Sequence, residues 1–212
     1  MKRILFIGDS ITDCERLKTS FTDMGKGYAN YVKATLGAEN PEKYEFLNRG
    51  ISGNRIVDLY ARIKADFINL APDIASIYVG VNDVWHEIMY NNGVSTDKFE
   101  KIYTMFIEEI YEALPNIKLM LIAPFVLKGI KTCDTEEIPD KLSRFIKDVR
   151  EKNEATKRIS EKFSLPCIDL QAEFDKLKEV APDDYWTVDG VHPTEMGHEI
   201  IKNLWLDTFS KI

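Results

Sequence analysis

The sequence predicts an α/β fold, a three-layer α/β/α sandwich built on a five-stranded parallel sheet. Short apolar segments that end at Gly or Pro alternate along the whole chain with longer segments whose apolar residues recur at helical spacing. Strands that alternate with helices form parallel βαβ units. Five such strands favour the flavodoxin-like order 2-1-3-4-5, with right-handed crossovers. The length of 212 residues suits a single domain, residues 1–212.

Five apolar segments are expected to form the strands. The first is ended by Gly8 and reads as buried, and the fourth is ended by Pro124. The second is less apolar than the others, which places it nearer an edge of the sheet. The expected strands are 3–7, 44–48, 74–79, 117–122 and 167–170.

Helices are expected between and after these strands. The segment 56–70 carries apolar residues at helical spacing until Pro72 stops it, and the amphipathic segment 96–114 ends at Pro115. Pro193 occupies a favourable first-turn position of the last helix. The expected helices are 27–36, 56–70, 96–114, 141–163 and 193–209.

Composition excludes several classes of function. The formal net charge of -7 disfavours binding to nucleic acid or to an anionic membrane. Only four apolar residues follow Met1-Lys2-Arg3, too few for a secretory signal, and no stretch approaches the ~20 residues of a membrane span. We therefore expect a soluble, cytoplasmic protein. The three cysteines, widely spaced, predict neither a disulfide framework nor a zinc site, and no metal or cofactor is expected.

The most unusual polar clusters follow the first three predicted strands. They are the segments 8–12, 48–54 and 80–83. In the order 2-1-3 these segments are neighbours, with Ser10 in the middle. Ligands of such sheets bind outside the carboxyl ends of the strands, so this edge is where chemistry is expected.

These segments contain what acyl transfer requires. Ser10 supplies a hydroxyl at a strand-to-helix turn, and the backbone N–H groups of Ser10 and Gly53 and the side-chain amide of Asn82 can stabilise an oxyanion. The base must be one of three histidines. His192 follows Asp189 by three residues, so that one tight turn can place the carboxylate against one ring nitrogen and leave the other free.

The segment that carries Ser10 and the segment that carries Asp189 and His192 resemble blocks of the SGNH, or GDSL, hydrolase superfamily. Gly8-Asp9-Ser10 is similar to the family's first block, which carries the nucleophile, and the segment 189–193 is similar to its fifth block. The resemblance implies that Asp189 and His192 complete a catalytic triad with Ser10.

The two middle segments extend the resemblance, which spans the chain from Gly8 to Pro193. The segment 50–54 is similar to the second block, with Gly53 as the oxyanion glycine, and the segment 80–83 to the third, with Asn82 as the oxyanion amide.

Within the superfamily the sequence is most similar to bacterial intracellular acetylxylan esterases. The segments 6–14, 25–28 and 80–85 and Trp186 ahead of Asp189 carry that similarity. It implies deacetylation of xylose units and a homo-oligomer. Gly190 and His86 depart from the expected pattern, in which a larger residue and an arginine would stand, and these departures concern the sugar preference.

Each assignment has an alternative. Ser10 could be a helix cap, Asp189 and His192 a loop salt bridge, and Asn82 a turn residue that bonds its own backbone. Ser52 is a rival nucleophile.

The surroundings of the predicted site also carry alternatives. Trp85, His86 and Trp186 are expected to contact substrate, with core packing as the alternative for the tryptophans and partial exposure for His86. Asp9 is expected to anchor its loop through backbone hydrogen bonds. His198 and Cys14 are expected to be structural. The connection 125–140 is expected to border the pocket, with a plain surface loop as its alternative.

The predicted function is a serine esterase that acts through an acyl-enzyme on a small ester, in particular an acetylated sugar or xylo-oligosaccharide. A lysophospholipase or thioesterase for longer acyl chains is the first alternative. A noncatalytic carbohydrate-binding domain is the second.

Overall fold

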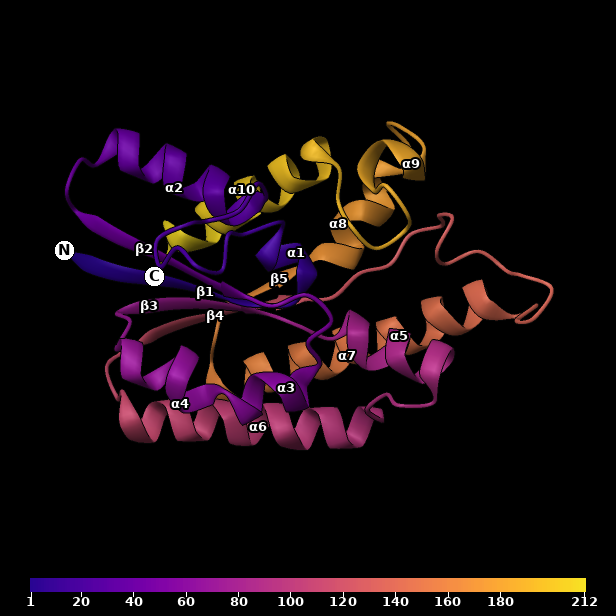
Figure 1. Ribbon diagram of the computed structural model, residues 1–212, viewed down its shortest axis with the longest axis horizontal. Helices are drawn as coiled ribbons and strands as arrows, with labels where there is room; N and C mark the ends of the chain where they lie inside the picture. The colour runs from indigo at the N-terminus through magenta and orange to yellow at the C-terminus, as the bar shows by residue number, and fades with distance from the viewer.

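A sheet of five parallel strands runs through the middle of the molecule (Figure 1). The computed structural model describes residues 1–212. The strand order is β2-β1-β3-β4-β5, which confirms the predicted fold class. The strands are β1 Lys2–Gly8, β2 Tyr44–Gly50, β3 Ile74–Tyr78, β4 Lys118–Ala123 and β5 Cys167–Asp169.

Strand β1 is the buried centre from which the rest is organised. Its four apolar residues Ile4 to Ile7 are fully buried, as a central strand with helices on both faces requires. Ile4 and Phe6 belong to the core on one face, and Leu5 and Ile7 to the core on the other. Strand β2 lies at an edge, as its weaker apolar character predicted.

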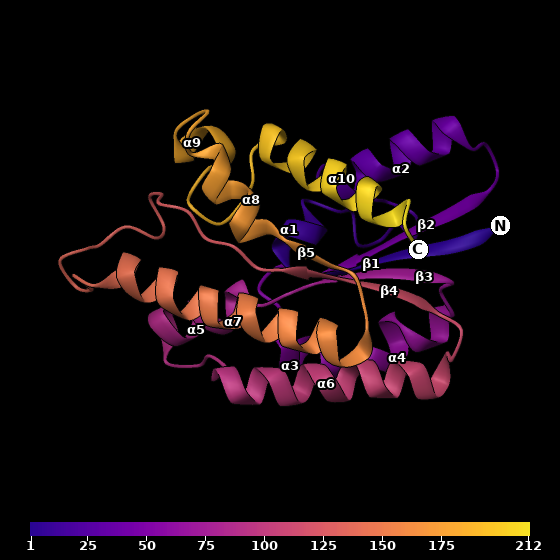
Figure 2. The same cartoon turned by 180° about the vertical axis from the view of Figure 1, so that it is seen from behind.

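The first face of the sheet is covered by the N-terminal and C-terminal helices (Figures 1 and 2). Trp205 of the last helix packs against Phe6 of β1, with ring centroids 5.2 Å apart, and Tyr28 meets Phe6 edge to face. The helices of this layer are α1 Ser10–Asp13, α2 Tyr28–Glu39, α8 Leu170–Leu177, α9 Asp183–Trp186 and α10 Glu195–Phe209.

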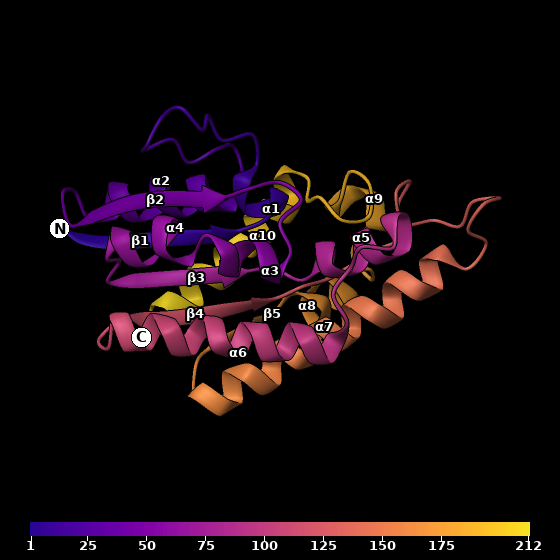
Figure 3. The same cartoon turned by 60° about the horizontal axis from the view of Figure 1, so that its bottom comes forward.

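The second face is covered by the helices from the middle of the chain. Figure 3 shows the two longest, α6 and α7, lying side by side under the sheet. The helices of this layer are α3 Ile56–Ala61, α4 Ile63–Asp66, the 3-10 turn Ile68–Leu70, α5 Val81–Tyr90, α6 Thr96–Ala113 and α7 Lys141–Phe163.

The predicted helix 56–70 is wrong as one element, because it is broken into three short pieces. At the first break Arg62 leaves helical geometry, with φ −113° and ψ 15°. Its side chain turns inward to the carboxyl end of the sheet, where it bonds carbonyl groups of β1 and β2. Tertiary hydrogen bonds therefore override the helical pattern here.

Two further boundaries differ from expectation. Asn82 lies not in a loop but in the first turn of α5, a helix that, like α8 and α9, is not among those predicted. Pro193 lies before the last helix, and Thr194 caps it by accepting the N–H of Gly197. No helix is both long enough and apolar enough to cross a membrane.

Candidate active site

Ser10 lies at the turn between β1 and α1. The N-cap of that helix is Asp9, whose Oδ1 accepts the N–H of Ile11 at 3.0 Å. Asp9, and not Ser10, is therefore the capping residue. Asp9 anchors the turn as expected. The turn is possible because Gly8 has no side chain: a Cβ there would lie 2.3 Å from the carbonyl oxygen of Tyr78.

A continuous chain of hydrogen bonds joins Ser10, His192 and Asp189. Ser10 Oγ is 2.9 Å from His192 Nε2, and His192 Nδ1 is 2.8 Å from Asp189 Oδ2. Because an ionised carboxylate only accepts, Nδ1 carries the proton and donates, and Nε2 is left to accept from the serine hydroxyl. That arrangement can take the serine proton during attack on a carbonyl.

The electrostatics of the pair fit that role. The hydrogen bond to Asp189 raises the pKa of His192 above its usual value, against the opposing effect of burial. Burial favours a higher pKa for Asp189, but hydrogen bonds from His192 and from two backbone N–H groups outweigh it and lower that pKa. Asp189 therefore stays ionised and holds the imidazole in one orientation.

The connection 125–140 supports the loop that carries Asp189. Leu127 N–H donates to Gly190 O at 2.9 Å, and Lys131 N–H donates to Asp189 O at 3.0 Å. Gly190 has φ +99°, and a Cβ there would lie 2.4 Å from Thr132 Oγ1. This contact gives a physical reason for the glycine that departs from the family pattern.

The oxyanion candidates come from the next two segments. Gly53 has φ +83°, which a glycine adopts without strain. Asn82 is 8% exposed, and its Nδ2 donates to Asn54 O at 3.3 Å. One N–H of that amide is thus anchored, and the other is available to a ligand.

Ser52, the rival nucleophile, has a different partner. Its hydroxyl donates to Asp13 Oδ2 at 3.0 Å, and its backbone N–H donates to the same oxygen at 3.1 Å. Ser52 forms no hydrogen bond with a histidine, so it lacks the imidazole base that Ser10 has. Its contacts instead tie the Gly53 turn to the end of α1.

The three residues expected to contact substrate lie in different surroundings. Trp186 is 6% exposed and its indole N–H donates to Ala181 O at 3.2 Å, which favours the packing alternative. Trp85 is half-buried, edge to face with Phe145. The imidazole of His86 lies beside the Gly53 turn, because a Cβ on Gly53 would lie 4.0 Å from its Nε2. Substrate contact stays a prediction for all three, and the geometry favours it most for His86.

His198 and Cys14 take the structural places expected of them. His198 Nδ1 accepts the backbone N–H of Tyr28 at 3.2 Å, and its Nε2 lies 3.4 Å from Cys14 Sγ. Burial lowers the pKa of His198 to about 4, so the ring is neutral and links α10 to the turn after α1.

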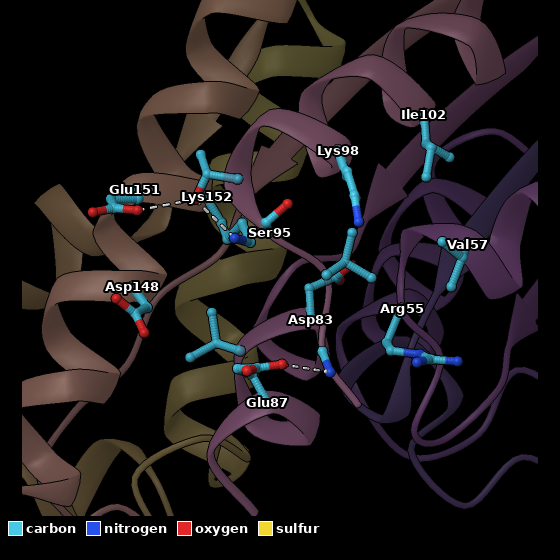
Figure 4. Close-up of a pocket in the computed structure, with 14 residues that line it drawn as sticks. Arg55, Val57, Asp83, Glu87, Ser95, Lys98, Ile102, Asp148, Glu151 and Lys152 are labelled. Carbon is cyan, nitrogen blue, oxygen red and sulfur yellow. Dashed lines mark hydrogen bonds between the residues drawn. The ribbon is translucent and has the colours of Figure 1, made fainter. Parts of the chain in front are cut away.

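A polar pocket of about 520 Å³ lies behind the Asn82 turn. Figure 4 shows the charged side chains of Asp83, Lys98 and Lys152 around it. Asp83 is fully buried, which raises its pKa to about 8, and both its oxygens accept the N–H of Ile56 at 3.2 Å. Neither Ser10 nor His192 lines this pocket, so it is separate from the hydrogen-bonded chain.

Two residues that build this site are not among those predicted from the sequence. Asp13 holds the Ser52 turn, and Arg62 bonds the ends of β1 and β2. Both are ordinary charged residues within helix-like segments, and no local signal marks their distant partners.

Comparison with known proteins identifies the family. The model of the GDSL-like lipase/acylhydrolase family matches residues 6–200. The acetylxylan esterase of Geobacillus stearothermophilus is 33% identical, with 97% of this chain and 92% of that protein covered.

Solved structures agree with that assignment. A protein of Parabacteroides merdae described as a GDSL-like lipase superimposes with a TM-score of 0.89 at 31% identity, covering 98% of this chain and 94% of the other. A variant of the Geobacillus esterase gives a TM-score of 0.84 at 31% identity over 98% and 93% of the two chains. Three variants of that esterase, with Ala in place of a serine, an aspartate or a histidine, are described as catalytic mutants. The chain therefore belongs to the GDSL-like lipase/acylhydrolase family and is a carboxylic ester hydrolase.

Proposed function

We propose that this protein is a serine esterase that removes short acyl groups, in particular acetyl, from sugars or xylo-oligosaccharides through a Ser10–His192–Asp189 triad. The observation that carries the proposal is the unbroken hydrogen-bonded chain from Ser10 Oγ through His192 to Asp189 at the carboxyl end of β1. The catalytic mutants of the Geobacillus relative, which replace the same three residue types, support it.

In the first step Ser10 Oγ attacks the ester carbonyl carbon while its proton passes to His192 Nε2. The carbonyl oxygen takes up the negative charge and lies against the N–H groups of Ser10 and Gly53 and the free N–H of Asn82. The bond to the alcohol oxygen then breaks. His192 returns its proton to that oxygen, and the sugar alcohol leaves an acyl group on Ser10.

In the second step a water molecule takes the place of the alcohol. His192 removes its proton as the water oxygen attacks the acyl carbon, and the same donors hold the second oxyanion. The Ser10 ester bond breaks, and the proton on His192 returns to Ser10 Oγ. Asp189 remains ionised throughout and stabilises the imidazolium that forms twice in each turnover.

The relatives and the open position of the base support this substrate class. The Geobacillus relative is an acetylxylan esterase. The His192 side chain is 40% exposed, so a bulky sugar alcohol can reach it from solvent. His86, beside the oxyanion turn, is the residue we assign to contact with the sugar or the acyl group.

The test compares wild-type protein with Ser10→Ala on acetylated xylo-oligosaccharides and on nitrophenyl esters of increasing acyl length. Ser10→Ala is expected to lower kcat by on the order of 10³-fold or more, as the loss of a triad nucleophile does. Ser52→Ala is the matched control and is expected to keep stoichiometric labelling by an organophosphate. Near-normal turnover by Ser10→Ala would overturn the triad. A rate that peaks at eight or more acyl carbons would instead favour the long-chain alternative.

A further inference from the structure

The guanidinium of Arg62 lies partly buried at the carboxyl end of the sheet, beside the Gly53 turn. The side chain is 13% exposed, and this partial burial lowers the pKa of Arg62, although an arginine remains charged. Removing a cation from water costs free energy that its hydrogen bonds must offset. Arg62 donates to Arg49 O at 2.8 Å, to Gly8 O at 3.2 Å, to Asn54 Oδ1 at 2.8 Å and to Asp66 Oδ2 at 3.0 Å.

Three of these four acceptors belong to the segments that surround Ser10. Gly8 O lies two residues before the nucleophile, at the end of β1. Arg49 O lies at the end of β2, where the chain enters the Gly53 turn. Asn54 directly follows Gly53. One guanidinium therefore joins the base of the nucleophile turn to both ends of the oxyanion turn.

A further hydrogen bond connects Asn54 to Asn82. Arg62 Nε holds the side chain of Asn54, and the backbone carbonyl of Asn54 accepts one N–H of the Asn82 amide at 3.3 Å. The direction of the remaining Asn82 N–H depends on that contact, because the amide group is planar. A shift of Asn54 would therefore rotate the donor that faces the oxyanion.

We propose that Arg62 is a positioning residue for the oxyanion hole, which it fixes through Asn54 and Asn82. The inference rests on the proposed function. Arg62 does not touch the substrate in this scheme. Its planar guanidinium binds three oxygen atoms at once, so the N–H donors of the segments that contain these oxygens are in place before the substrate binds.

Only arginine can make this set of contacts. A lysine has the same charge and a similar reach, but its ammonium is a single point that cannot span Gly8 O, Arg49 O and Asn54 Oδ1 together. A purely structural role would depend mainly on charge and on the ion pair with Asp66, which Arg62→Lys could preserve. Arg62→Lys therefore separates positioning from charge.

The expected effect falls on kcat. Loss of one oxyanion donor costs about 10²–10³ in kcat, so a misplaced donor in Arg62→Lys should lower kcat by about 10–100-fold. KM for a nitrophenyl acetate should change by less than about threefold, because the ground-state ester does not use the oxyanion donors fully. Asp66→Asn, which leaves the three sheet-end contacts in place, is the matched control and should lower kcat by less than about twofold.

A double-mutant cycle with Asn82→Ala tests the route. If Arg62 acts through Asn82, adding Arg62→Lys to Asn82→Ala should lower kcat little further. The kcat of the double variant should lie within about twofold of that of Asn82→Ala. Losses that multiply, or a loss confined to KM, would overturn the inference. Rates are expressed per active site, counted by organophosphate labelling of Ser10, so that partial unfolding does not imitate a loss of kcat.

A second variant covers the case in which Arg62→Lys does not fold. Asn54→Ala removes the acceptor of Arg62 Nε and leaves the backbone carbonyl that holds Asn82, and it should show the same non-additivity with Asn82→Ala at a smaller kcat loss. An Asn54→Ala effect that multiplies with Asn82→Ala would overturn the inference. Absence of ester turnover in wild-type protein, or turnover that survives Ser10→Ala, would instead overturn the proposed function.

Discussion

Asp9→Asn should remove a pH-dependent loss of stability that the wild-type protein suffers between pH 4 and pH 7. The Asp9 carboxyl is fully buried beside Ser10. Its Oδ1 accepts one backbone N–H, from Ile11, and its Oδ2 has no hydrogen-bond partner. Burial therefore raises the pKa of Asp9 from the ordinary 3.8 to about 7, although the Ile11 hydrogen bond and the nearby His192 oppose the rise.

The magnitude and its sign follow from proton linkage. At about 1.4 kcal/mol for each pKa unit, the rise to about 7 means that ionising Asp9 costs the folded state about 4 kcal/mol. The unfolded chain loses this proton near pH 4 and the folded chain near pH 7, so the folded state binds more protons between these values. The free energy of unfolding therefore falls as pH rises through that window and levels off above it.

The assay is denaturant unfolding of wild-type and Asp9→Asn proteins from pH 4 to pH 8. Asparagine has the shape of the protonated carboxyl and does not ionise, so the variant should gain about 4 kcal/mol on the wild type across this range. Asp169→Asn is the matched control. Burial raises the pKa of Asp169, but the hydrogen bonds from Lys157 and Asn153 outweigh it and lower that pKa. The difference in free energy of unfolding between Asp169→Asn and wild type should stay constant from pH 5 to pH 8. Parallel curves for wild type and Asp9→Asn would refute the reasoning.

Two further variants test the loop that carries the base. Asp189→Asn removes the charge that raises the pKa of His192, so the acid limb of the kcat/KM profile should move to lower pH, and kcat should fall by on the order of 10⁴-fold; an unmoved limb in a pH–rate series would contradict the pairing. Gly190→Ala places a Cβ at φ +99° and 2.4 Å from Thr132 Oγ1, so it should cost about 1–3 kcal/mol of unfolding free energy. In a thermal unfolding comparison, Gly37→Ala, in open space within α2, should stabilise by about 0.5–1 kcal/mol.

The parts of the fold that the sequence predicts are those set by local pattern. The three central strands, β1, β3 and β4, are short apolar runs, because a strand covered on both faces has no polar side. The Asp189–His192 pair is also local: the two residues are three positions apart, and one turn brings Asp189 Oδ1 to two backbone N–H groups. Such contacts depend on neighbours in the chain and can be anticipated from it.

The parts that escaped prediction depend on distant partners. Arg62 meets Gly8 O across 54 positions of the chain, and its turn inward breaks a segment whose apolar spacing is helical. A tryptophan such as Trp186 can contact a sugar or pack in the core. The residue type alone does not distinguish the two, because the surrounding residues determine which of them occurs. The helix α5 was hidden because its first turn, with Asn82 and Asp83, has the composition of a polar loop.

The close approach of the end of β2 to the end of α1 constrains the geometry of the candidate site. Gly8 and Gly50 lie opposite each other in register. A Cβ on Gly50 would lie 2.2 Å from the backbone nitrogen of Asp13, at the end of the short helix that begins with Ser10. A single methyl group would therefore push the nucleophile turn away from the Gly53 turn. Asp13 and Arg62 then hold the two turns at this spacing through hydrogen bonds with Ser52 and with Asn54, the neighbours of Gly53 in the chain. The spacing between the Ser10 turn and the Gly53 turn thus depends on backbone contact and on the hydrogen bonds of Asp13 and Arg62.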